Sequence, residues 1–149
     1  MKKVFLSLLV FVSLFGFSQS NSLVGKWKVI ALNNSEVFYN VTTDSISIMS
    51  EDLKETYDNE SKMKFLVDLI RKMYTNNSFE FTDKGVFKMT SSLAGTIEYR
   101  YKNDIGRSII VTENLSDDGT NYEMSYKFKD SQLYLSMTPE LLFILEREK

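Results

Sequence analysis

Apolar and polar residues alternate along most of the second half of the chain. The alternation is clearest over 122–128, where aromatic and methionine side chains are separated by Glu, Ser and Lys. A period of two is typical of a strand that buries one face, and Gly, Asn, Asp and Ser between such segments favour turns. We expect strands over 23–32, 37–41, 45–49, 79–81, 86–89, 97–101, 108–112, 122–128, 133–137 and 141–146. Their close spacing predicts sequential antiparallel neighbours, and hence a single all-β domain folded as an up-and-down antiparallel β-barrel.

The inward positions of these strands define the expected core. They follow from the two-residue period and from the apolar character of the side chains. The predicted core residues are Trp27, Val29, Phe79, Phe81, Phe87, Ile97, Tyr99, Tyr122, Met124, Tyr126, Leu133, Leu135 and Phe143.

The hydrophobic period changes to that of a helix between residues 51 and 74. Ser50 and Ser61 are candidate N-caps, so this helical insertion is one broken helix or two short ones. Apolar residues at three- and four-residue spacing form one stripe: Met63, Leu66, Val67, Ile70 and Tyr74, widened by Phe65, Leu69 and Met73. A helix of two or three turns is marginal in water and must dock to persist. We expect the following residues to pack against the barrel, closing one mouth or covering one face: Met63, Leu66, Val67, Ile70 and Met73.

The first twenty residues have the order of a secretory signal peptide. Lys2 and Lys3 precede an apolar run over 4–17, and small or polar residues follow at 18–20. The run is short for a membrane span, although an uncleaved anchor is the alternative. We expect export to the periplasm or the extracellular space, with cleavage between Phe17 and Asn21. The expected organisation is a signal peptide over 1–19 and one barrel domain over 20–149.

The composition narrows the possible chemistry. The chain has no Cys and no His, and its net charge is −2. Zinc sites, Cys or His nucleophiles and Ser-His-Asp triads need the missing residue types, and so does lipid attachment at a lipoprotein Cys. A mildly acidic surface disfavours nucleic-acid binding. Acidic residues over 51–60 are better explained as a solvated helix face than as a metal site, so we expect no enzyme, no cofactor, no metal and no membrane span in the mature form.

Three short motifs carry a family resemblance. Gly25-Lys26-Trp27 lies in the first strand, a Phe-x-x-Asp-Gly-x-Phe-like hairpin covers 81–87, and the last strand is Leu-rich over 141–145. This layout resembles the small secreted lipocalin-like proteins of Bacteroidetes, and more broadly the lipocalin and fatty-acid-binding-protein barrels. The resemblance implies that Trp27 plugs one barrel end and that Arg147 packs on it. Gly25 would let the first strand pass close to its neighbours.

The chain also departs from those families. It lacks the disulfides of many lipocalins and the Arg-x-Tyr that holds a carboxylate in fatty-acid-binding proteins, so no ligand site is carried over. From the residues alone, the candidate ligand-binding side chains are the inward-facing residues of two strands: Tyr99, Tyr101, Tyr122, Met124 and Tyr126. The alternative is that these are packed core residues with hydroxyls reaching the barrel mouth.

Two functions follow from this pattern. We predict non-enzymatic binding of a small apolar molecule in the barrel or under the helices, with oligomeric state and ligand identity open. The alternative is an envelope or extracellular protein-interaction module with a filled barrel. A cavity would favour ligand binding, whereas a filled interior with an apolar patch outside it would favour protein interaction.

Overall fold

The computed structural model of the protein describes residues 22–114 and 121–149. The expected signal peptide and the turn expected over 116–119 lie outside these residues. The described strands are β1 (Gly25–Asn33), β2 (Val37–Asn40), β3 (Ser45–Ile48), β4 (Ser78–Phe81), β5 (Val86–Ser91), β6 (Gly95–Asp104), β7 (Ile109–Asn114), β8 (Asn121–Lys129), β9 (Gln132–Thr138) and β10 (Leu141–Arg147). Two helices, α2 (Glu51–Thr56) and α3 (Glu60–Tyr74), lie between β3 and β4.

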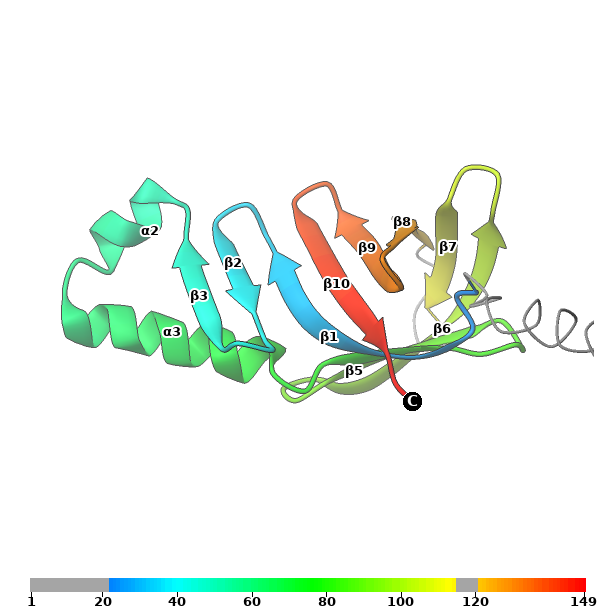
Figure 1. Cartoon of the computed structure of the whole chain (residues 1–149), viewed down its shortest axis with the longest axis horizontal. Helices are drawn as coiled ribbons and strands as arrows, with labels where there is room; N and C mark the ends of the chain where they lie inside the picture. The colour runs from blue at the N-terminus through cyan, green and yellow to red at the C-terminus, as the bar shows by residue number, and fades with distance from the viewer. Residues whose placement is uncertain (1–21, 115–120) are drawn as a thin grey trace, which may run out of the picture.

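Eight of these strands close into an antiparallel barrel (Figure 1). β4 to β10 follow one another in sequence order, and β1 lies between β4 and β10 and completes the ring. Short connections explain why each strand from β4 onward pairs with the next. The all-β antiparallel barrel with a helical insertion is therefore confirmed.

The hairpin of β2 and β3 lies outside the ring, because β1 changes partner along one edge. Residues 25–28 of β1 pair with β4, whereas residues 31–33 of β1 pair with β2. At the changeover the Val29 N–H donates to the Asn77 carbonyl at 3.1 Å, and the Val41 N–H donates to the Ile30 carbonyl at 2.9 Å. The expectation that every strand neighbours the next around the barrel was thus wrong at this point. Nine residues make β1 long enough to pair with two strands in succession.

Side-chain caps begin both helices. The Ser50 hydroxyl accepts a hydrogen bond from the Leu53 N–H at 3.2 Å, as predicted. α3 is capped by Asn59, whose side chain accepts from the Lys62 N–H at 3.0 Å. The prediction that Ser61 caps this helix was wrong, because Asn59 is an equally favourable cap two residues earlier.

α3 docks beneath the β2–β3 hairpin at one end of the barrel (Figure 1). Leu66 and Ile70 are buried in the main hydrophobic cluster, and Met63 packs against it in part. At the end of the helix, the Tyr74 ring packs against Phe143 of the barrel, with ring centroids 6.4 Å apart. Met73, which we expected to pack inward, is 36% exposed because it lies beside the buried face of the helix.

Polar contacts tie α3 to the hairpin beside it. The buried Tyr39 of β2 donates its hydroxyl to Asp44 at 3.2 Å and shares a hydrogen bond with the Thr75 hydroxyl at 3.2 Å. Arg71 of α3 also contacts Asp44, with 2.8 Å between Nε and Oδ1. The Arg71 guanidinium lowers the pKa of Asp44, so this carboxylate stays charged in ordinary buffers.

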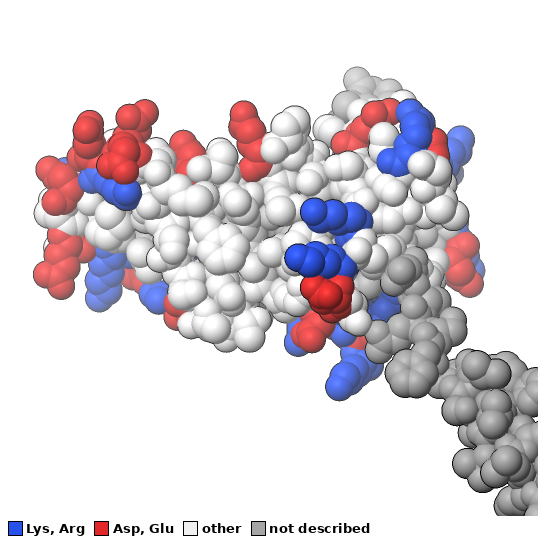
Figure 2. All heavy atoms as spheres, turned by 45° about the horizontal axis from the view of Figure 1, so that its top comes forward, with Lys and Arg blue, Asp and Glu red and all other residues white. Residues whose placement is uncertain are grey.

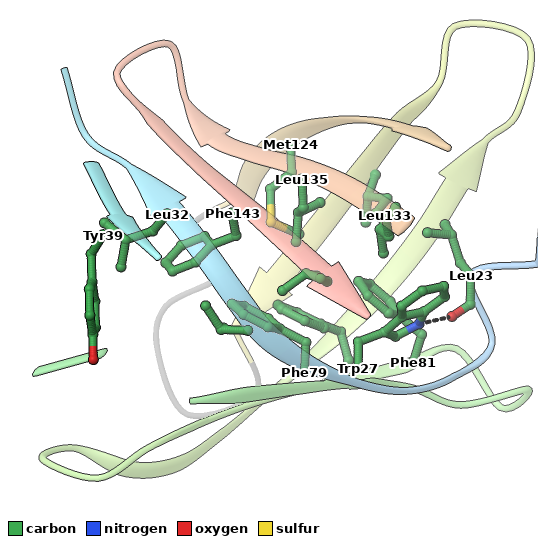
Figure 3. Packing of buried hydrophobic residues seen from close by; sticks show 14 of the residues in the cluster. Leu23, Trp27, Leu32, Tyr39, Phe79, Phe81, Met124, Leu133, Leu135 and Phe143 are labelled. Atoms are coloured by element: carbon green, nitrogen blue, oxygen red, sulfur yellow. Dashed lines mark hydrogen bonds between the residues drawn. The ribbon is translucent and has the colours of Figure 1, made fainter. Parts of the chain in front are cut away.

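Aromatic side chains fill the centre of the barrel (Figure 3). Phe87 stacks on Phe79 and Phe81 with ring centroids 5.8 and 4.7 Å apart, and Phe143 meets Phe79 at 5.2 Å. Most of the predicted core is confirmed as buried: Trp27, Val29, Phe79, Phe81, Phe87, Met124, Leu133, Leu135 and Phe143. Three predicted core residues are only partly buried: Ile97, Tyr99 and Tyr126. Tyr122 is 48% exposed, so its assignment to the core was wrong.

The turn between β1 and β2 offers a test of backbone strain. Ser35 is exposed and has a φ of +68°, a left-handed conformation that disfavours residues with a Cβ. We expect Ser35→Gly to raise the free energy of unfolding by about 0.5–1 kcal/mol. The control is Ser47→Gly in β3, an exposed extended position where the same change should lower it by a similar amount. Urea denaturation of both variants measures the difference, and a shift of the same sign in both would contradict the prediction.

Candidate functional site

The predicted ligand residues lie on the inner faces of β6 and β8. Tyr99 stacks on Phe87 with ring centroids 5.6 Å apart, and Tyr101 meets Phe81 edge-on at 5.3 Å. On β8, Met124 is buried and Tyr126 packs edge-on against Phe128 at 5.8 Å. The two-residue period of each strand places these side chains on the face that holds the core.

Tyr101 and Tyr126 line the same hollow at the barrel end where β1 begins. They line this hollow, of about 360 Å³, together with the residues before β1, the end of β6 and the turn after it: Ser22, Leu23, Val24, Asn103 and Ile105. We call this hollow the tyrosine mouth. Ile105 is 77% exposed at its rim, whereas Leu23 is buried at its base. The arrangement combines an apolar lining with two aromatic rings and a few polar atoms, as small-molecule sites do.

The other predicted ligand residues lie elsewhere. Tyr99 meets Tyr122 edge-on at 6.5 Å, and neither is among the residues that line the tyrosine mouth. Met124 lines a second hollow of about 390 Å³ beside Met137 and Pro139. The structure thus brings together two of the five predicted residues and separates the other three from them.

Burial raises the pKa of two of the predicted tyrosines, Tyr99 and Tyr101, above a value at which they are already protonated at neutral pH. It raises the pKa of Tyr101, and the nearby Asp83 carboxylate raises it further. Burial likewise raises the pKa of Tyr99, with a smaller effect from Tyr122. The Tyr101 hydroxyl donates to the Thr82 carbonyl at 2.9 Å. At neutral pH these groups are therefore hydrogen-bond donors rather than anions.

Arg147 holds one wall of the tyrosine mouth. Its guanidinium lies over the Trp27 ring, with Cζ 4.4 Å from the ring centroid. Nη1 donates to the Val24 carbonyl at 2.6 Å, and Nη2 donates to the Ser22 carbonyl. The Trp27 Nε1–H donates to the Leu23 carbonyl at 2.8 Å (Figure 3). The side chains of Trp27 and Arg147 therefore fix the chain segment whose residues form the wall.

Gly25 makes this arrangement possible. Its φ is +142°, and a Cβ built on it would collide with Nη1 of Arg147. The resemblance implied that Arg147 packs on Trp27, and the structure brings these two side chains together. Gly25 was expected to admit neighbouring backbone, whereas it makes room for the Arg147 side chain. The sequence analysis did not predict that Leu23 and Ile105 belong to the site. Leu23 lies at the edge of a strand and Ile105 lies in a turn, where no hydrophobic period marks them.

A hollow of about 750 Å³ beside β5, β6 and β7, which Tyr101 also lines, was missed as well. Lys84, Arg100, Lys102 and Glu113 are among its lining residues. Within residues 22–114 and 121–149, no three acidic side chains converge in a group that could hold a metal ion. No helix of that described part is both long and apolar enough to cross a membrane.

Comparison with known proteins gives a likeness of fold. Neither the protein-family models nor the curated proteins match this sequence. The chain is similar to the crystal structure of a DUF4847 family protein from Bacteroides vulgatus, with a TM-score of 0.53 and 13% identity. The likeness covers 85% of this chain and 94% of the other. This likeness supports a barrel fold like that of the Bacteroides protein, and it gives no information about function.

Proposed function

We propose that the protein is a non-enzymatic binding protein that takes a small apolar molecule at the tyrosine mouth. The observation that carries the proposal is the hollow of about 360 Å³ in which Tyr101 and Tyr126 face Leu23 and Ile105. Ligand sites usually enclose about 300–1,000 Å³, so this hollow suits a small aromatic molecule or a short acyl chain. The phenylalanine side chains packed at the barrel centre support a site at the end of the barrel rather than in its middle.

The proposal includes the finer features expected from the sequence. The contact of Arg147 with Trp27 supports a lipocalin-like barrel. The order of charged, apolar and small residues over 1–20 supports export to the periplasm or the extracellular space. N-terminal sequencing of the protein recovered outside the cytoplasm tests export, and an intact Met1 in membrane fractions would contradict it.

Binding of a neutral fluorescent probe tests the site. N-phenyl-1-naphthylamine should bind the purified protein with a saturable rise in fluorescence. Tyr126→Ala should weaken this binding about tenfold, because loss of an aromatic wall removes about 1–1.5 kcal/mol. The control is Tyr134→Ala, because Tyr134 lies on the outer face of β9 beneath Lys127. Equal weakening in both variants, or fluorescence that does not saturate, would contradict the proposal.

A further inference from the structure

The hollow of about 750 Å³ beside β5, β6 and β7 has about twice the volume of the tyrosine mouth. We call it the cationic hollow. Basic side chains from the turn after β4 and from β6 line it: Lys84, Arg100 and Lys102. Glu113 is the acidic residue among the described residues of this lining. The cationic hollow therefore has an excess of positive charge, although the net charge of the whole chain is −2.

The pairing of β6 brings these basic residues together. β6 pairs with β5 over its first part and with β7 over its last part, so its end continues past the start of β5. Arg100 and Lys102 are two residues apart and lie on the same face of β6, opposite to the face that carries the Tyr101 ring. The Tyr101 N–H donates to the Gly85 carbonyl at 2.8 Å. This hydrogen bond holds the turn that carries Lys84 beside β6.

Apolar side chains lie next to the two basic residues of β6. Val86 of β5 is directly opposite Arg100, and Val111 of β7 is directly opposite Lys102. Both valines are half-buried, and both line the cationic hollow. Residues directly opposite each other on paired strands share one face, with Cβ atoms about 4.5–5.5 Å apart. The cationic hollow thus combines apolar surface with positive charge at short range.

The three basic residues have no ion-pair partner within the described part of the chain. The ion pairs of residues 22–114 and 121–149 involve other cations: Lys28, Lys54, Lys62, Arg71, Lys88 and Arg107. Figure 2 shows basic and acidic side chains next to one another at the helical end, where Lys54 pairs with Glu51. Glu113 lies opposite Arg100 across β6 and β7, but it is not among these pairs. The charge of the cationic hollow is therefore available to a ligand.

We propose that the cationic hollow binds a small organic anion, in which a carboxylate, sulfonate or phosphate group is attached to a hydrocarbon body. The acidic group contacts the Arg100 guanidinium, whose planar fork matches two oxygens of such a group. Lys84 and Lys102 add positive charge around it. The hydrocarbon body lies against Val86 and Val111. A concave site with apolar walls strengthens the attraction, because it focuses the electric field of the cations.

The cationic hollow is a second site, separate from the tyrosine mouth. Tyr101 lines both hollows, whereas their other described lining residues differ. No Lys or Arg is among the described residues that line the tyrosine mouth. The tyrosine mouth therefore suits a neutral apolar molecule, and the cationic hollow suits a charged one. The two sites should bind their ligands independently.

Two fluorescent probes with the same aromatic body test this proposal. 8-Anilinonaphthalene-1-sulfonate carries a sulfonate that N-phenyl-1-naphthylamine lacks. The sulfonate probe should bind saturably, more weakly as NaCl rises from about 0.05 to 0.5 M, and the neutral probe should not displace it. Arg100→Gln and Lys102→Gln should each weaken its binding at least about fivefold and leave binding of the neutral probe unchanged. The control is Lys64→Gln, which removes the same charge from an exposed position of α3 and should affect neither probe.

Competition experiments identify the kind of anion. Displacement of the sulfonate probe by hexanoate or phenyl phosphate would support a free organic anion as the ligand. Displacement only by vesicles of phosphatidylcholine and phosphatidylglycerol would assign the charge to a membrane surface and overturn the proposal. Equal weakening by Lys64→Gln and Lys102→Gln, or displacement by the neutral probe, would also overturn it. Binding of the neutral probe is measured separately, so failure here leaves the proposal for the tyrosine mouth testable.

Discussion

Trp27→Ala is expected to lower the free energy of unfolding by about 3–5 kcal/mol. Trp27 is 1% exposed and packs against Phe128 with ring centroids 6.1 Å apart. The substitution leaves a cavity at the barrel end, and it removes the hydrogen bond from Nε1 to the Leu23 carbonyl. It also removes the ring beneath the Arg147 guanidinium. Urea denaturation measures the loss, and a change below about 1 kcal/mol would contradict the structural placement of Trp27.

Trp27→Phe separates packing from hydrogen bonding. Phenylalanine keeps an aromatic ring in the barrel and leaves the Leu23 carbonyl without its indole partner. We expect a smaller loss of roughly 1–3 kcal/mol, from the lost hydrogen bond and the smaller ring. Residues 22–24 should then exchange their amide hydrogens faster, because one of the two side chains that hold them is altered.

The alternation of apolar and polar side chains predicted which face of a strand each residue lies on better than it predicted how far the residue is buried. On β8 the two-residue period correctly placed Met124 on the inner face with Tyr126 beside it. The same period assigned Tyr122 to the core, although it is 48% exposed. Period reports orientation, whereas burial near a strand end depends on which neighbouring segments cover it. That information is not local to the strand.

The pairing of strands was the other feature that the local sequence pattern could not predict. The β character of residues 37–41 and 45–49 was clear, but nothing in them shows that β1 pairs with β4 along one half and with β2 along the other. For the candidate site, the aromatic residues of the barrel wall were predictable from their types and spacing. The walls supplied by Leu23 and Ile105 were not, because they come from segments whose position is set by Arg147 and by a turn.

Gly25→Ala should be the most damaging single-methyl addition in the first strand. An alanine at this position must adopt a φ of +142°, and its Cβ must displace Nη1 of Arg147 from the Val24 carbonyl. Backbone strain costs about 1–3 kcal/mol, and the displaced guanidinium loses its hydrogen bonds and its contact with Trp27. We expect the free energy of unfolding to fall by about 2–4 kcal/mol.

A double-mutant cycle with Arg147→Ala separates the two causes. Arg147→Ala alone should cost about 1–2 kcal/mol through the lost hydrogen bonds and the lost stacking on Trp27. In that background the added methyl group meets no guanidinium, so only the backbone strain at Gly25 remains. The two losses should then sum to at least about 1 kcal/mol more than the loss in the double variant, because both single changes break the same contacts. Losses that add within about 0.3 kcal/mol would show that the guanidinium does not press on position 25, and that Gly25 serves the backbone conformation alone.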